Sequence, residues 1–168
     1  MKTRLTGLIV AALVFFADQF SKYMVMVPFD LKARGQIEIL PFFNLTWVEN
    51  YGVSMGFLTA DTELGQWLLI ALTGAISIAV LIWLWREKNR QDVLALGLIL
   101  GGALGNIVDR VRFGHVVDFA DLHFGDIRPF LVFNVADAAI TIGVVILLLR
   151  ALLVREQPKV PRKENADA

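Results

Sequence analysis

Four long apolar segments most constrain what this chain can fold into. A helix that crosses a bilayer needs about 20 mostly apolar residues. Four segments reach or approach that length: Leu5 to Val27, Trp67 to Trp85, Val93 to Val108 and Phe130 to Leu153. Hydrophobic residues make up 57% of the chain, against about 45–50% in soluble domains. We therefore predict an all-α membrane protein with four transmembrane helices, forming a single domain over residues 1–168.

The distribution of charge predicts the orientation. Net charge is zero, which argues against a basic surface for nucleic acid. If both termini and the loop at residues 86–92 share one side, that side carries ten of the sixteen Lys and Arg residues: Lys2, Arg4, Arg86, Lys88, Arg90, Arg150, Arg155, Lys159, Arg162 and Lys163. The positive-inside rule then places both termini in the cytoplasm. The first apolar segment continues past Asp18 without a cleavage pattern, so we expect a retained helix.

The longest stretch between spans, about residues 28–66, is an expected extracytoplasmic insertion. Apolar residues alternate at Ile37 and Ile39 and again from Phe43 to Trp47, which predicts short strands of a small sheet. Residues 49–57 contain two glycines and predict a loop that turns back. Arg112 to Arg128 is expected to be a second outer loop, and about residues 156–168 a disordered cytoplasmic tail.

Several polar and small residues lie within or beside the predicted spans. Asp18 and Lys22 are four apart, which predicts an ion pair at a helix end with Lys22 reaching the lipid interface. Small residues spaced by four favour close helix packing in lipid; here they are Gly97, Gly101 and Gly105. The next helical turns place three polar residues on one face: Asn106, Asp109 and Arg110.

Asp137 is the clearest anomaly. A fourth helix that begins near Phe130 would place Asn134 and Asp137 one to two turns inside its outer end, where a charge costs a few kcal/mol. Asp118 lies in an apolar stretch on the same side. Two adjacent carboxylates share a proton, as in aspartic proteases, and can activate a water without a metal or a covalent intermediate. No cysteine is present, which excludes a thiol nucleophile.

Spacing alone leaves other functions open. The acids could form a proton- or cation-translocating site in a small transporter, or structural polar pairs: Asp18, Asp109, Asp118 and Asp137. A metal site could use His115, Asp118 and His123. The glycine stripe could serve a non-catalytic assembly factor. Ser21 and Ser54 have no His–Asp arrangement that indicates a serine protease.

Four motifs narrow these alternatives. They are Asp18-Gln19-Phe20-Ser21-Lys22, Asn50-Tyr51-Gly52, GNIVDRVRFGHVVDF from Gly105 to Phe119, and FNVADAAI from Phe133 to Ile140. With them the chain resembles the bacterial lipoprotein signal peptidases, or signal peptidase II family, over nearly its whole length. After Asn50 the family commonly has Thr, then Gly and small residues, then an aromatic residue. This chain departs from that pattern, because Tyr51, Ser54 and Met55 fill those places and Phe57 follows two residues later.

The resemblance implies an aspartic endopeptidase of the bacterial inner membrane, with its active site near the extracytoplasmic face. It would cleave signal peptides from prolipoproteins just before a diacylglyceryl-modified cysteine, within membrane lipid. It implies no cofactor or metal, and we expect a monomer. The implied catalytic pair is Asp118 and Asp137. The implied substrate-binding residues are Asn50, Gly52, Asn106, Asp109, Arg110 and Asn134, with Asp18 and Lys22 as structural support.

Overall fold

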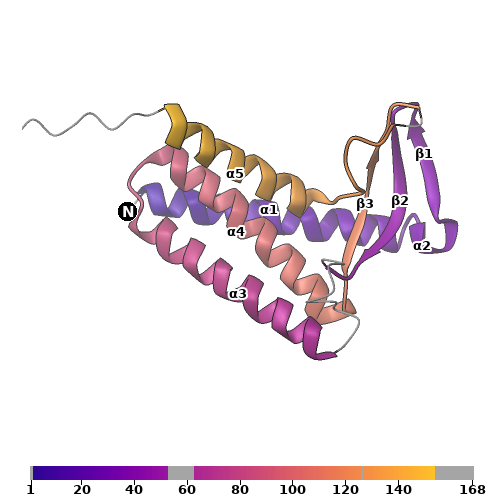
Figure 1. The fold of residues 1–168 in the computed structure, drawn as a ribbon, viewed down its shortest axis with the longest axis horizontal. Coiled ribbons are helices and arrows are strands. Elements are labelled where there is room, and N and C mark those ends of the chain that lie inside the picture. Colours follow the sequence, from indigo (N-terminus) through magenta and orange to yellow (C-terminus); the bar gives the residue numbers. More distant parts are fainter. Residues whose placement is uncertain (1, 53–62, 126, 154–168) are drawn as a thin grey trace, which may run out of the picture.

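Four long helices form the body of the protein. The computed structural model describes residues 2–52, 63–125 and 127–153. The long helices are α1 (Lys2–Met26), α3 (Glu63–Arg86), α4 (Arg90–Phe113) and α5 (Val135–Leu153), and a short α2 (Leu31–Arg34) follows α1 (Figure 1). Each long helix is long and apolar enough to cross a membrane. The four predicted spans are therefore confirmed.

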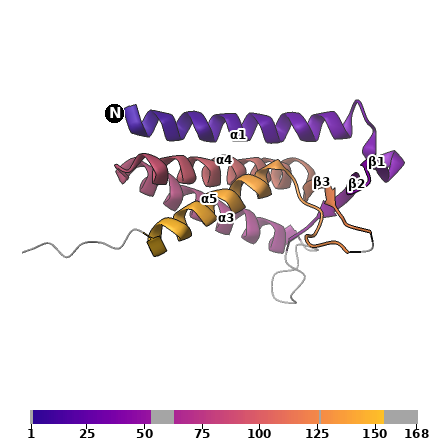
Figure 2. The same cartoon turned by 90° about the horizontal axis from the view of Figure 1, so that it is seen from above.

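The central helix of the bundle is α4. It packs against α1, α5 and α3, and Figure 2 shows α1 on one side of it with α3 and α5 on the other. A Cβ atom built at Gly101 would overlap the carbonyl oxygen of Ala11, and one at Gly97 would lie 2.5 Å from that of Gly7. The glycine stripe thus lets the backbones of α4 and α1 approach closely, as predicted.

A three-stranded antiparallel sheet lies across one end of the bundle, here called the sheet end (Figure 1). Its strands are β1 (Gln36–Leu40), β2 (Phe43–Asn50) and β3 (Val116–Leu122), in the order β1-β2-β3. The two strands predicted within the insertion are confirmed. The predicted loop from residue 112 to 128 is wrong in part, because it contains β3. All residues of β3 except the last are buried, so it lacks the alternation that reveals a half-exposed strand.

Two helices end or begin at other residues than the predicted apolar segments, although the third segment was short enough to be expected to continue past Val108. The third span runs on to Phe113, where Gly114 ends it in a left-handed conformation, with φ of 82°. The fourth helix begins at Val135 rather than near Phe130. The reason is that Phe133 is extended and exchanges backbone hydrogen bonds with Ala120 of β3.

The N-terminus and the far end of α5 lie together at the end of the bundle opposite the sheet (Figure 1). This arrangement agrees with the predicted shared side for the termini, although which side is cytoplasmic stays a prediction. The predicted loop at residues 49–57 begins later, because Glu49 and Asn50 belong to β2. Its remainder after Gly52, including Ser54 and Met55, lies outside the described residues, as does the predicted tail.

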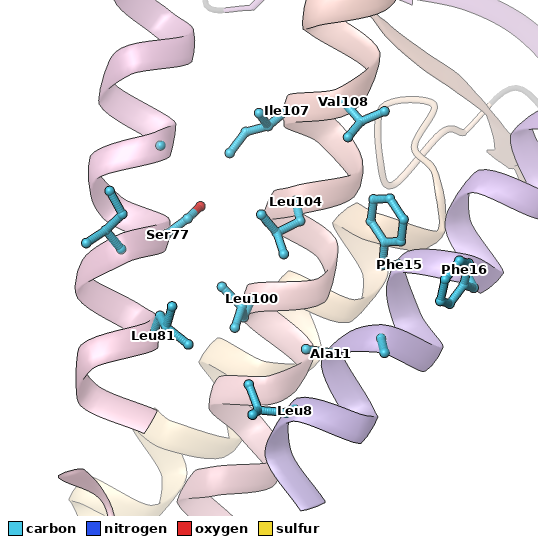
Figure 3. Close-up of a pocket in the computed structure, with 13 residues that line it drawn as sticks. Leu8, Ala11, Phe15, Phe16, Ser77, Leu81, Leu100, Leu104, Ile107 and Val108 are labelled. Carbon is cyan, nitrogen blue, oxygen red and sulfur yellow. The ribbon is translucent and has the colours of Figure 1, made fainter. Parts of the chain in front are cut away.

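A wide apolar groove of about 750 Å³ opens between α1, α3 and α4. Figure 3 shows Phe15 of α1 and Ser77 of α3 on opposite sides of it, with Leu104 of α4 between them. Its one hydroxyl group, that of Ser77, donates to the carbonyl oxygen of Thr73. No acid or base lines this groove, so it does not contain the carboxylates that the sequence singles out.

Candidate active site

The sheet end holds both carboxylates of interest. Asp118 lies in the middle of β3 with only 1% of its surface exposed. Asp137 lies in the first turn of α5, not one to two turns inside the helix as predicted. The side chain of Asn134 accepts the N–H of Asp137 at 2.9 Å, and Asp137 accepts the N–H of Asn134 at 3.3 Å. This reciprocal capping box begins α5 and fixes its first acid.

Amide groups hold every oxygen of this Asp118–Asp137 pair. Asn134 donates to Oδ1 of Asp118 at 2.6 Å, and Asn50 donates to its Oδ2 at 2.9 Å. Asn106 donates to Oδ1 of Asp137 at 2.8 Å, and the backbone N–H of Asn134 occupies its Oδ2. Asn134 therefore touches both acids and fixes their relative orientation.

The two carboxyl groups also interact electrostatically. Burial and, to a smaller degree, the nearby negative charge of Asp137 raise the pKa of Asp118 from its ordinary 3.8 to about 7. Hydrogen bonds from Asn50 and Asn134 act in the opposite direction and are too weak to cancel the effect of burial. Asp118 can therefore hold or release a proton near neutral pH.

A buried ionic cluster lies directly beneath the pair. Lys22 is 2.8 Å from Oδ2 of Asp18 and 2.7 Å from Oδ2 of Asp109, and it donates to Oδ1 of Asn106 at 3.2 Å. The predicted ion pair between Asp18 and Lys22 is present. However, the expectation that Lys22 reaches the lipid interface is wrong, because 1% of its side chain is exposed. Its ammonium group instead pairs with the buried carboxylate of Asp109 on α4.

Gln19 belongs to this cluster and was not among the predicted site residues. Its amide donates to Oδ1 of Asp109 at 3.0 Å and to Oδ2 of Asp18 at 3.2 Å. Gly105 makes room for the cluster, because a Cβ atom there would lie 2.5 Å from Oδ2 of Asp18. The sequence could have indicated Gln19 as a site residue, because it lies beside Asp18 in the first motif.

Arg110 lies at the edge of the site. Its guanidinium group interacts electrostatically with Asp137, Asp118 and Asp109. Its Nε atom is buried and has no hydrogen-bond partner within the described part of the chain. An unpaired buried donor is costly, so this N–H is available to a group that enters the site.

The end of β2 also borders the site, because Asn50, its last residue, contacts Asp118. The N–H of Gly52 donates to Oδ1 of Asn50 at 2.9 Å, which orients the Asn50 amide toward Asp118. Gly52 has a φ of 106°, a conformation that L side chains rarely adopt. The Asn50-Tyr51-Gly52 turn thus depends on glycine at its third position.

The atypical Tyr51 lies in a separate polar cluster on β2. Its hydroxyl donates to Oε2 of Glu49 at 2.7 Å, and Lys32 lies 2.8 Å from Oε1 of the same carboxylate. These contacts lower the pKa of Glu49 to about 2, with the hydrogen bond from Lys32 as the largest cause. The ring of Tyr51 also lies against His115. Glu49 therefore braces the strand end that presents Asn50.

The alternative metal site does not form. His115 lies beside Glu49, whereas the backbone of His123 pairs with Phe42 at the far end of β3. Asp118 lies between them in the sequence, and its side chain accepts from Asn50 and Asn134. Within residues 2–52, 63–125 and 127–153, no group of three His, Cys, Asp or Glu side chains could hold a metal ion.

A second groove of about 310 Å³ reaches Asp137 along α5. Apart from Asp137 and Thr141, its lining is apolar: Phe130, Leu131, Phe133, Ala138 and Ile142. An apolar peptide segment that occupies this groove would therefore bring one of its backbone peptide bonds next to Asp137.

A family model described as "Signal peptidase (SPase) II" matches residues 10–153. The chain belongs to the signal peptidase II family. It is 63% identical to the lipoprotein signal peptidase of Rhizorhabdus wittichii over 96% of this chain and 93% of that protein. It is 59% identical to that of Sphingopyxis alaskensis over 90% and 87%. This signal peptidase II family member is therefore a peptidase of the membrane.

Solved structures support the same fold for this signal peptidase II family member. A bacterial membrane enzyme determined by the in meso method at 2.3 Å resolution is 31% identical, with a TM-score of 0.74. The match covers 92% of this chain and 94% of that one. A second such enzyme, at 1.9 Å, is 33% identical over 88% and 92%, with a TM-score of 0.73. The roles of the individual site residues stay predictions.

Proposed function

We propose that this peptidase removes signal peptides from prolipoproteins, cutting just before a diacylglyceryl-modified cysteine with a water activated between Asp118 and Asp137. The observation that carries the proposal is the pair itself. One acid is buried with a pKa near 7, and its neighbour lies at the N-terminus of a helix. A helix N-terminus favours negative charge, which suits a carboxylate that acts as the base.

The proposed mechanism assigns one role to each acid. Asp118 holds the shared proton and donates a hydrogen bond to the scissile carbonyl. Ionised Asp137 takes a proton from the water, which attacks the carbonyl carbon. Asp118 transfers its proton to the carbonyl oxygen, which gives a gem-diol. Asp137 then passes its proton to the leaving amine as the C–N bond breaks, and Asp118 recovers a proton from a diol hydroxyl. One water is consumed and no covalent enzyme intermediate forms.

The surrounding residues supply the proposed substrate contacts. The Nε of Arg110, which has no hydrogen-bond partner among the described residues and belongs to a group that interacts electrostatically with both acids, is suited to donate to a substrate carbonyl oxygen. The groove beside Asp137 is apolar and suits the hydrophobic part of a signal peptide or its lipid. Gly52, just after β2, holds the Asn50 side chain that contacts Asp118.

The alternative functions predict different results. The proposed activity requires peptide cleavage, whereas a transporter would move protons or ions without cleavage and an assembly factor would not cleave peptides. The test is incubation of the purified protein in vesicles with a diacylglyceryl-modified prolipoprotein and, separately, with the unmodified precursor. Mass spectrometry should show a mature chain that begins at the modified cysteine. Equal cleavage of the unmodified precursor would contradict lipid recognition, and no cleavage of either would contradict the proposed substrate.

A further inference from the structure

The mechanism above gives no role to Lys22, whose ammonium group lies buried beside the acid pair. Lys22 is 1% exposed, and the two acids that flank it, Asp18 and Asp109, are fully buried. Removing such charges from water costs several kcal/mol per ion, and an apolar replacement is often as stable. Stability alone therefore does not explain why this chain has a buried ionic cluster. The contacts of the cluster with the Asp118–Asp137 pair suggest a functional role instead.

Every donor of the Lys22 ammonium group has a partner. A lysine ammonium has three N–H donors. In this structure they serve Asp18, Asp109 and the side-chain oxygen of Asn106, at 2.8, 2.7 and 3.2 Å. The ammonium thus joins two helices, α1 and α4, at a single point below the acids.

Asp18 connects this point to α5. Its Oδ1 accepts the backbone N–H of Ala136 at 3.0 Å. Ala136 directly precedes Asp137 in the first turn of α5, where backbone N–H groups have no partner within the helix. The position of Asp137 therefore depends on where Asp18 is held.

Asp109 makes the matching connection to β3. Its Oδ2 accepts the backbone N–H of Val117 at 3.2 Å. Val117 directly precedes Asp118. Each acid that contacts Lys22 therefore holds the residue immediately before one member of the Asp118–Asp137 pair.

Asn106 makes a third connection between Lys22 and the acid pair, and this one fixes the orientation of the Asn106 amide group. Its side-chain oxygen receives donors from Lys22 and Asn134, while its NH₂ group donates to Asp137. If the Asn106 amide were flipped, its NH₂ group would face the Lys22 ammonium and its oxygen would face the Asp137 carboxylate, and both contacts would be repulsive. Lys22 thus selects the orientation in which Asn106 offers a hydrogen to Asp137.

We propose that Lys22 is a positioning residue that sets the separation and orientation of Asp118 and Asp137, by bridging Asp18 and Asp109 and by orienting Asn106. This inference rests on the proposed function. Small misplacements of reacting groups can cost about 100-fold in rate, so the effect belongs in kcat rather than in substrate binding.

The test measures kcat, KM and the pH profile per folded enzyme with the diacylglyceryl-modified precursor. Lys22→Met leaves two acids without their cation and can prevent folding. The decisive variant is therefore Asp18→Asn/Lys22→Met, which removes one charge of each sign and keeps an oxygen for the N–H of Ala136. We expect kcat to fall at least ~10-fold, KM to change less than ~3-fold, and the pH profile to shift.

Arg150→Gln is the matched control. Arg150 joins α5 to Asp92 of α4 at 2.5 Å, at the end of the bundle far from the acids. Its loss should lower the unfolding temperature and leave kcat and the pH profile unchanged. If the double variant behaves the same way, with normal kcat and pH profile, the positioning role is overturned.

If the double variant does not fold well enough to be purified, Lys22→Arg tests the positioning role of Lys22. It retains the charge but replaces a compact ammonium with a larger planar group, so kcat should again fall at least ~10-fold. A wild-type kcat would contradict the inference. Active Asp118→Asn or Asp137→Asn enzymes would instead contradict the proposed function, whatever the Lys22 variants do.

Discussion

The side chain of Asn134 donates to Asp118 at 2.6 Å. The same residue caps α5 and accepts the N–H of Asp137. A single side chain therefore starts the helix that carries one acid and orients the other. The cap and the contact with Asp118 can be separated by substitution.

Asn134→Ser should preserve the cap and lose the contact with Asp118. Serine is a good N-cap residue, but its side chain is one atom shorter and does not reach β3. We expect near-normal thermal stability and a kcat reduced by ~10-fold or more, because a fixed donor to a reacting acid is lost. Asn134→Ala should show the same loss of kcat and about 1 kcal/mol lower stability. Full activity in Asn134→Ser would exclude the orienting role.

The pKa of Asp118 predicts how activity depends on pH. The proposed acid must be protonated, so kcat should be high below pH 7 and fall as pH rises through about 7. A kcat measured across pH 5 to 9 in vesicles, with folding checked at each pH, tests this. A kcat that rises between pH 6 and 8 would contradict the assignment of the proton to Asp118.

The same shift predicts the pH dependence of stability. Asp118 has a higher pKa folded than its ordinary 3.8, so between these values the folded protein binds this proton more tightly than the unfolded chain. Its contribution to the free energy of unfolding is full below pH 3.8 and is lost as pH rises through about 7. Thermal unfolding of wild type and Asp118→Asn should therefore diverge in their pH dependence over this window. Parallel curves would contradict the raised pKa.

Asn50→Ala should move the basic limb of the kcat profile to higher pH. The Asn50 amide donates to the carboxylate of Asp118 and lowers its pKa. Without this donor the proton is held more tightly, so more alkaline solution is needed to remove it. The measurement is the pH at half-maximal kcat, compared with wild type. A shift to lower pH would show that Asn50 does not act on the charged form of Asp118.

Gly101→Ala should separate α4 from α1. Its new Cβ would overlap the carbonyl oxygen of Ala11, and overpacking of this kind costs about 1–3 kcal/mol. The matched control is Gly74→Ala on α3, where nothing lies within 4 Å of the added atom. Thermal unfolding in detergent should show a lower midpoint for the first variant only. Equal midpoints would mean that the close approach at Gly101 is unimportant.

The sequence predicted the four spans because each apolar run is long enough to cross a membrane. Spacing left the pairing of Asp118 and Asp137 as one of several possibilities, and the resemblance carried by their two long motifs favoured it. The sequence did not indicate β3, since a strand buried on both faces has no alternating pattern. It also placed the start of α5 too early, because the apolar run includes Phe133, which pairs with β3 instead.

The burial of Lys22 could not be predicted from its own helix. Local spacing shows Asp18 four residues away, and this pairing suits an exposed helix end as well as a buried one. The second acid, Asp109, lies 87 positions further along the chain. The close contact of α1 with α4, made possible at Gly101 and Gly105, brings it to 2.7 Å from Lys22. Only the packed bundle reveals this contact.

The most direct test of the central claim is the cleavage rate of three Asp→Asn variants with the diacylglyceryl-modified precursor. Asp121 supplies the matched control, because it is 1% exposed on the same strand as Asp118 but pairs with Thr46 and Arg128 outside the site. Asp118→Asn and Asp137→Asn should be folded and lose cleavage by ~10³-fold or more, whereas Asp121→Asn should retain kcat. Normal cleavage by folded Asp118→Asn or Asp137→Asn would contradict the account.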